Sequence, residues 1–297
     1  MKTELERDKN HSAFWQRLHM ALAFYAKQLW HQTPGTPITF CVAHFNGGDF
    51  LEITLHSIRR YHPKARIIVA DSRSNRSQFA AACMVCKKFT AELHPLIGKH
   101  SHTGSLNYLF RQIRSKIGVF LDQDCVLLES LNPLLQKMDN ILLAGPRDEM
   151  RATHPNTFER YPSLKNQLFR FQPEFVHASL MLMNVRRLRS HVGRWPFRWE
   201  SAWGALPAEP YFGFTERVRR KAANAILWLD SQHTGYGLGT VYLHEGIPVA
   251  YHNWLSGRVL DQNGKMDGGV VDVDWLRSEM SRFIKDYRSD ALKLDLQ

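Results

Sequence analysis

The sequence predicts an α/β fold with a central, mostly parallel β-sheet flanked by helices. Short apolar runs suited to buried strands alternate with stretches of helical periodicity through the first half of the chain. Three of these runs end in polar residues, as strands do where they lead into functional loops. A chain of 297 residues, 44% of them hydrophobic, can bury the core of one such large domain.

The first-half elements follow in a regular order. The run at 38–44 predicts a strand, the pattern at 50–61 a helix, and the run at 66–70 a second strand. Strand, helix and strand in this order indicate a parallel βαβ unit. An Ala-rich stretch after Gln78 predicts a further helix. A helix at 105–114 then leads into a third strand at 117–121.

The second half of the chain is less regular, and we expect an irregular region there. Its expected elements are a strand at 175–185, a Trp- and Pro-rich loop region at 194–214, a helix at 215–229, a strand at 247–254, a mobile polar loop at 256–269 and a helix at 275–287.

Charge narrows the choice of partners. The formal net charge of +11 favours anionic ligands such as nucleotide phosphates, acidic glycans or an anionic membrane surface. The basic residues are spread along the chain, and no nucleic-acid-binding motif accompanies them, so we expect no nucleic-acid partner.

Cysteine usage and hydropathy indicate the compartment. The four cysteines are too few for a disulfide scaffold, and the zinc-like spacing of Cys83 and Cys86 lacks a second pair, so reduced thiols are expected. No secretory signal and no apolar run of about 18 residues is visible. These patterns predict a soluble, cytoplasmic protein, with peripheral contact to the inner face of the membrane as an alternative.

Polar residues follow three of the predicted strands. His44, Asp71 and Asp122 each stand where a strand ends, and ligands of open α/β sheets bind outside the carboxyl ends of strands. Asp122 and Asp124 offer two carboxylates one residue apart, between two apolar runs, where buried charge needs a compensating partner. Carboxylate oxygens suit Mg²⁺ or Mn²⁺, which commonly adds substrate phosphates as ligands.

Three segments together resemble GT-A glycosyltransferases, a Rossmann-like fold, and especially glycosyltransferase family 2. The segment 38–51 is similar to the opening strand and turn of the family, and 67–75 to its second strand with an Asp-containing turn. Gly104-Ser-Leu-Asn107 followed by 119–124 resembles its helix and metal motif. The resemblance covers residues 38 to about 130 well and the rest only loosely.

The resemblance implies a donor site with assigned residues. The backbone at Ala43 and His44 would line the nucleotide pocket, and Asp71 would accept a hydrogen bond from the base. Asn107 would lie near the nucleotide or the sugar, and Gln123 would contribute to the same site. Two plainer interpretations stay open: Asp71 caps the next helix, and Asn107 only faces the same rim.

The resemblance also implies a metal site for Mn²⁺ or Mg²⁺. Asp122 would contact ribose or metal, and Asp124 would be the main ligand. The late segment 247–258 is similar to one in which a histidine completes metal coordination, so His252 is a candidate ligand, although a histidine on a strand is often a core residue. Arg258 is a plausible diphosphate contact.

The general base is the least determined part. Inverting transfer needs a base that reaches the acceptor hydroxyl, and the Glu-Asp pair usual in the family is absent. Asp230, after an apolar run, is the first candidate, and Glu209 and Glu245 are weaker ones. Alternatively, Asp230 caps a helix starting near Gly237. Trp195, Trp199 and Trp203 are either a sugar-stacking platform or core residues.

The resulting hypothesis is a metal-dependent glycosyltransferase, a hexosyl- or related transferase of inverting type. It would move a sugar from a UDP- or GDP-linked donor to a glycan or lipid-linked acceptor, in glycan or cell-envelope polysaccharide synthesis. The alternatives are a sugar-phosphate nucleotidyltransferase and a non-catalytic basic binding protein on a degenerate transferase fold.

The expected domain organisation has three parts. An N-terminal region, 1–36, carries an amphipathic helix at 11–32 that either packs on the domain or contacts a membrane. The catalytic domain spans 37–260, with a nucleotide-binding half at 37–130 and an acceptor-side half at 131–260. Residues 261–297 form a loop and a C-terminal helix.

Overall fold

The structure is a computed structural model of the full chain. It describes residues 37–96, 102–149, 174–193, 196–197, 200–203, 206–208, 210–222, 224–234, 239–253, 265–266, 269–270 and 273–290. The expected helix at 11–32 lies outside these residues.

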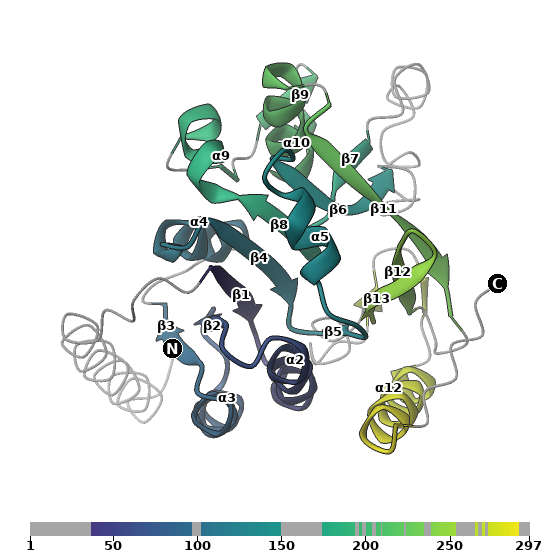
Figure 1. The fold of residues 1–297 in the computed structure, drawn as a ribbon. Coiled ribbons are helices and arrows are strands. Elements are labelled where there is room, and N and C mark those ends of the chain that lie inside the picture. Colours follow the sequence, from purple (N-terminus) through teal and green to yellow (C-terminus); the bar gives the residue numbers. More distant parts are fainter. Residues whose placement is uncertain are drawn as a thin grey trace.

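A large central sheet forms the body of the molecule (Figure 1). Its strands are β1 (Ile38–His44), β2 (Arg66–Asp71), β3 (Glu92–Pro95), β4 (Ile117–Asp122), β5 (Cys125–Leu127), β6 (Leu143–Glu149), β7 (Glu174–Val176), β8 (Leu180–Asn184), β11 (Ile226–His233), β12 (Thr240–His244) and β13 (Ile247–His252). They run in the order β3-β2-β1-β4-β8-β6-β11-β12-β13-β5, with β7 beside β6.

Helices flank this sheet, and two short hairpins stand apart from it. The helices are α2 (Gly48–Tyr61), α3 (Arg76–Lys88), α4 (His102–Gln112), α5 (Asn132–Lys137), α9 (Val185–Val192), α10 (Pro210–Lys221) and α12 (Val273–Arg288). The hairpin strands are β9 (Glu200–Trp203) with β10 (Leu206–Ala208), and β14 (Lys265–Met266) with β15 (Gly269–Val270). The predicted α/β fold, a central sheet with flanking helices, is confirmed. The expectation of a mostly parallel sheet is wrong: the sheet is mixed, with parallel pairing among β1, β2, β3 and β4 and between β6 and β11, and antiparallel pairing elsewhere.

Alternation along β1 shows how the sheet buries both faces. Phe40 and Val42 belong to an apolar cluster with residues of α2, α3 and α5. Cys41 and Ala43 point to the other side, into a cluster with residues of α4, α9 and α10. Because successive side chains of a strand face opposite ways, a strand covered on both faces must be a continuous apolar run. That is why 38–44 could be recognised as a strand from sequence.

The four strands β3, β2, β1 and β4 are parallel to their neighbours in this part of the sheet, which carries the residues expected at the donor site. β1 pairs in parallel with β2 and β4, and β2 with β3. In this register His44 lies beside Asp71, and Ala43 beside Asp122. The expectation that three polar strand ends share one edge is therefore confirmed for β1, β2 and β4.

Antiparallel pairing begins at β8, which lies between β4 and β6. β11 pairs in parallel with β6, and then β12, β13 and β5 complete the sheet in antiparallel fashion. The last helix, α12, packs below β13, where the Phe283 ring stacks on Tyr251 with centroids 3.9 Å apart. Both rings are buried.

Three sequence predictions in the second half are wrong. The expected single strand at 175–185 is β7 and β8 separated by a turn. The expected helix at 215–229 ends with α10, and its last four residues begin β11, because β6 offers them a parallel partner. The expected loop region at 194–214 contains β9, β10 and the start of α10. Tertiary pairing overrode local preference in these segments.

A polar network joins β2 to β3 beneath α4. Arg66 forms two hydrogen bonds of 2.7 Å to the carboxylate of Glu92, and His94 Nε2 lies 3.5 Å from the same carboxylate. Burial alone would raise the pKa of Glu92, but the hydrogen bonds from His94 and Arg66 outweigh it and lower that pKa to about 2. Glu92 is therefore a carboxylate whose charged form the fold stabilises.

All four cysteines are free thiols, as expected. Burial raises the pKa of Cys86 on α3 to about 12, which keeps this thiol protonated. Among the helices that the structure describes, none is long and apolar enough to span a membrane.

Candidate active site

Two carboxylates and a histidine converge at the edge of the sheet. Asp122 is the last residue of β4, and Asp124 stands just before β5. Antiparallel pairing of β13 with β5 sets His252 directly opposite Cys125. A histidine more than a hundred residues later in the chain thus reaches the acidic motif through strand pairing.

The three side chains are close enough to share one cation. His252 Nε2 lies 3.3 Å from Asp124 Oδ1 and 3.6 Å from Asp122 Oδ2. One potential ligand atom from each residue lies within 4.8 Å of the others. The hydroxyl of Tyr242 lies 3.1 Å from His252 Nδ1, and this contact orients the ring so that Nε2 faces the carboxylates.

Burial gives this cluster its electrostatic character. His252 and Asp124 are almost fully buried, and the side chain of Asp122 is 18% exposed. Desolvation raises the pKa of Asp122, while His102 and His252 lower it and Asp124 raises it. Two carboxylates that are costly to keep charged side by side gain most from a bound divalent cation.

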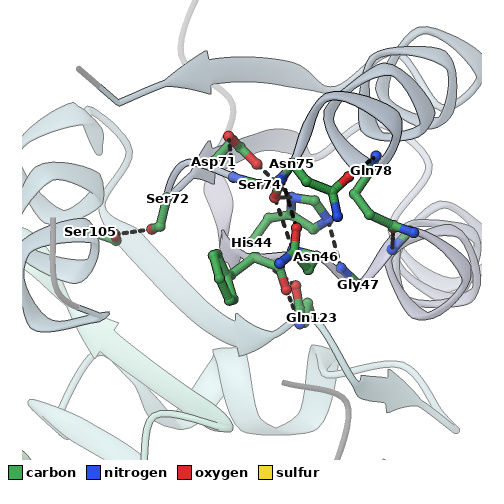
Figure 2. A network of polar contacts seen from close by, with 12 residues as sticks. His44, Asn46, Gly47, Asp71, Ser72, Ser74, Asn75, Gln78, Ser105 and Gln123 are labelled. Atoms are coloured by element: carbon green, nitrogen blue, oxygen red, sulfur yellow. Dashed lines mark hydrogen bonds and ion pairs between the residues drawn. The ribbon is translucent and has the colours of Figure 1, made fainter. Parts of the chain in front are cut away.

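His44, the last residue of β1, uses both of its ring nitrogens for contacts within the protein. His44 Nδ1 lies 3.0 Å from Asp71 Oδ1, and both side chains are almost inaccessible to solvent. The Gly47 N–H donates to His44 Nε2 (3.3 Å), so these partners assign the ring proton to Nδ1, which donates to Asp71. His44 therefore connects β2 to the turn between β1 and α2 (Figure 2).

Asp71 is also engaged within the protein. Its Oδ2 accepts a hydrogen bond from the Ser74 N–H (3.2 Å), and the residue is 1% exposed. The helix cap of α3 is Asn75, whose side chain accepts from the Gln78 N–H (2.9 Å). The interpretation of Asp71 as that cap is thus wrong.

Asn107 lies on α4, and its amide is clamped to a backbone. The Phe197 N–H donates to Asn107 Oδ1 (2.9 Å), and Asn107 Nδ2 donates to the Phe197 carbonyl oxygen. The residue is 6% exposed. These contacts hold the segment before β9 against α4.

Asp230 is not brought to the acidic cluster. It lies on β11 opposite Leu243, and it is exposed. Paired residues share a face of the sheet, and Leu243 packs with Tyr251 and Phe283 beneath α12. His252, next to Tyr251 on β13, points to the other face, so Asp230 and His252 lie on opposite faces. The expected helix near Gly237 is replaced by β12 from Thr240 onward.

The remaining predicted residues are placed only in part. Glu245 lies in the turn between β12 and β13, where it is exposed and paired with Lys137. Trp203 is the last residue of β9. Arg258, Glu209, Trp195 and Trp199 lie outside the described residues.

Sequence reasoning missed two histidines beside the cluster. His102 Nε2 lies 3.8 Å from Asp122 Oδ1. The His177 ring lies 6.0 Å from the His252 ring and 5.1 Å from that of Tyr211, measured between centroids. His102 begins α4, two residues before the Gly104 segment that the sequence singles out, and this position was the available signal. His177 follows β7, in a turn inside the segment 175–185 that the sequence predicts as one strand.

Comparison with known proteins gives the following likenesses. No curated protein sequence matches this chain. A mannosyltransferase from Pyrobaculum calidifontis, solved with GDP-Man and Mn²⁺, is 15% identical, with a TM-score of 0.44; 73% of this chain and 64% of that chain are covered. Glucosyl-3-phosphoglycerate synthase from Mycobacterium tuberculosis, solved with Mn²⁺ and UDP-glucose, is 18% identical, with a TM-score of 0.45 and coverages of 72% and 73%.

The family assignment rests on the sequence itself. The model of the family described as glycosyl transferase family 2 matches residues 39–188, which is half of the chain. This segment starts in β1, contains the Asp122-Gln123-Asp124 motif and ends in α9. The chain therefore belongs to glycosyl transferase family 2.

Proposed function

We propose that this protein is a metal-dependent glycosyltransferase that moves a hexosyl or related group from a UDP- or GDP-linked donor to an acceptor hydroxyl. The observation that carries the proposal is the convergence of Asp122, Asp124 and His252 at the edge of the sheet. The acceptor is a glycan or a lipid-linked acceptor, in glycan or cell-envelope polysaccharide synthesis.

The three side chains fit Mn²⁺ or Mg²⁺. Carboxylate oxygens suit both ions, and a nitrogen ligand favours Mn²⁺ over the harder Mg²⁺. Asp122, Asp124 and His252 would hold the ion and leave coordination positions for donor phosphates. When bound, the metal neutralises charge on the diphosphate and so stabilises it as a leaving group.

The protein's own residues would bind and orient the donor. Ala43 pairs with Asp122 and His44 with Asp71 in the sheet, so the backbone at these two residues would line the nucleotide pocket beside the metal site. The net charge of +11 favours an anionic nucleotide donor. Arg258 remains a predicted contact of the diphosphate. Asn107 remains a predicted neighbour of the donor, which it would affect by holding the Phe197 backbone in place.

The acceptor side is a prediction from sequence. We propose transfer with inversion. Asp230, the candidate base from the sequence, lies on the face of the sheet opposite His252, where it does not reach an acceptor hydroxyl that attacks a donor held at the metal site. Asp230→Asn should therefore keep most of the wild-type kcat, whereas loss of a positioned base would lower kcat by about 10² to 10⁴. Peripheral membrane contact through residues 1–36 is likewise a prediction.

The two alternatives are less favoured. The family to which the chain belongs is described as one of glycosyl transferases, and neither a nucleotidyltransferase nor a non-catalytic basic protein performs sugar transfer. The discriminating experiment incubates the protein with a panel of UDP- and GDP-sugars, with Mn²⁺ and with EDTA. We expect Mn²⁺-dependent release of UDP or GDP from one donor. Release of none, together with metal-independent nucleotide binding, would contradict it.

A further inference from the structure

Gln123 stands between the two carboxylates of the candidate metal site, and its side chain is bound to a different segment. The Phe45 N–H donates to Gln123 Oε1 (2.8 Å), and Gln123 Nε2 donates to the Phe45 carbonyl oxygen (3.0 Å). Gln123 is 6% exposed. The paired hydrogen bonds hold the Gln123 amide group against the Phe45 backbone, in the turn between β1 and α2.

Two further contacts hold Gln123 in this position. The hydroxyl of Thr54, a fully buried residue on α2, donates to the Gln123 carbonyl oxygen (2.8 Å). Gly47 packs so closely on the amide that a Cβ there would lie 2.5 Å from Gln123 Cδ. A larger side chain at position 47 would therefore have to displace the Gln123 amide. Both the backbone and the side chain of Gln123 are therefore anchored to the turn and the helix that follows it.

The same turn is anchored on its far side to the end of β2. The Asn46 N–H donates to Ser74 Oγ (2.9 Å), and the Asn75 N–H donates to Asn46 Oδ1 (2.8 Å). His44, which pairs with Asp71, also has its Nδ1 3.3 Å from Ser74 Oγ. A continuous polar network thus runs from the acidic motif through the turn to β2 (Figure 2).

We propose that Gln123 is a positioning residue that couples metal binding to nucleotide binding. Gln123 fixes the positions of Asp122 and Asp124 relative to the turn at residues 45–47. The metal site and the part of the nucleotide site formed by this turn are then held at a constant separation. The proposal rests on the proposed function and replaces direct donor contact as the role of Gln123.

The physical reason is preorganisation. A donor that contacts both the metal and the turn binds both at once only if their separation is already correct; otherwise part of its binding free energy is used to order them. Holding the two parts together makes each ligand raise the affinity for the other, and this coupling is reciprocal.

The measured quantity is the coupling factor, the ratio of UDP or GDP affinity with saturating Mn²⁺ to that without it, from calorimetry. Replacing Gln123 with Met keeps the size of the side chain and removes both hydrogen bonds. We expect the coupling factor to fall about tenfold, equivalent to about 1.4 kcal/mol, while metal-free affinity changes little. In a steady-state assay the same variant should raise the KM for the donor and lower kcat.

The matched control is Asn184 at the opposite end of the sheet, opposite Ile117 in the register of β8 with β4. Its amide also bonds two backbone groups: Nδ2 donates to the Met138 carbonyl oxygen (2.8 Å), and Oδ1 accepts from the Arg187 N–H (3.3 Å). Asn184→Leu removes a comparable buried pair of bonds. We expect it to lower the melting temperature and to keep the coupling factor of the wild type.

The outcomes separate the two proposals. If Mn²⁺ does not change the affinity of the wild-type protein for UDP or GDP, the proposed function is overturned, and this inference with it. Gln123→Met with an unchanged coupling factor, or an equal loss in Asn184→Leu, would overturn the positioning role alone. If Gln123→Met does not fold, Gly47→Ala supplies the test, since its methyl group displaces the Gln123 amide; a coupling factor equal to that of the wild type would then refute the proposal.

Discussion

Replacing Asp71 with alanine distinguishes two roles for a buried carboxylate. If Asp71 mainly holds His44 and the turn after β2, its loss destabilises the fold; if it mainly faces the nucleobase, its loss weakens nucleotide binding. In the structure each of its oxygens accepts from a buried donor, His44 Nδ1–H or Ser74 N–H. We therefore expect the stability effect to dominate.

The magnitude follows from those two bonds. A buried donor that loses its acceptor costs about 1–3 kcal/mol, so Asp71→Ala should lower the free energy of unfolding by about 2–6 kcal/mol. That is a large share of the roughly 5–15 kcal/mol of a typical domain. Asp71→Asn keeps an oxygen for one of the two donors and should lose about half as much.

Urea denaturation followed by circular dichroism measures this effect. The control is Asp139→Ala: Asp139 is 67% exposed and pairs with Lys116 at the surface, and such pairs contribute about 0–1 kcal/mol. An Asp71→Ala variant that unfolds at the urea concentration of the wild type, yet discriminates less among nucleobases, would refute the reasoning.

Three further predictions concern the metal site, pH and the last helix. His252→Ala should weaken Mn²⁺ affinity at least about tenfold by calorimetry, and Tyr242→Phe, which removes only the orienting hydroxyl, should weaken it less; equal affinity in all three proteins would contradict the ligand assignment. The pKa of Glu92 is lowered from 4.5 to about 2, so its stabilising effect is present above about pH 4.5 and is lost as pH falls through about 2. The free energy of unfolding of Glu92→Gln, measured by urea titration, should therefore fall less steeply over this pH range than that of the wild type. An unaltered pH profile would count against this prediction. Phe283→Ala should cost about 3–5 kcal/mol in unfolding free energy, because the ring is fully buried against Tyr251, and a thermal melt like that of the wild type would show that α12 is not docked there.

The first half of the fold was predictable because its signals are local. Strands buried on both faces are continuous apolar runs, as at 38–44, and their polar ends stand where the chain leaves the sheet. The parallel βαβ order then fixes which ends meet, so the sequence alone was enough to assign His44, Asp71 and Asp122 to one edge.

The second half was not predictable because long-range pairing determines it. Residues 226–229 follow a helix, and their sequence pattern predicts that the helix continues through them. In the structure they form a strand because they pair with β6. Asp230 looked like an active-site acid because it follows an apolar run, but the register of β11 with β12 turns it to the face that carries α12. The role of Gln123 was likewise hidden, since no sequence pattern shows that its amide meets the Phe45 backbone.

The central claim is that Asp122, Asp124 and His252 bind a divalent metal that nucleotide-sugar binding requires. The most direct measurement is a calorimetric titration of UDP and GDP, with Mn²⁺ present, into the wild type and Asp124→Ala. We predict Mn²⁺-dependent binding of one nucleotide to the wild type and none to the variant, with unchanged circular dichroism spectra. Retained Mn²⁺-dependent affinity in a folded Asp124→Ala protein would contradict the claim.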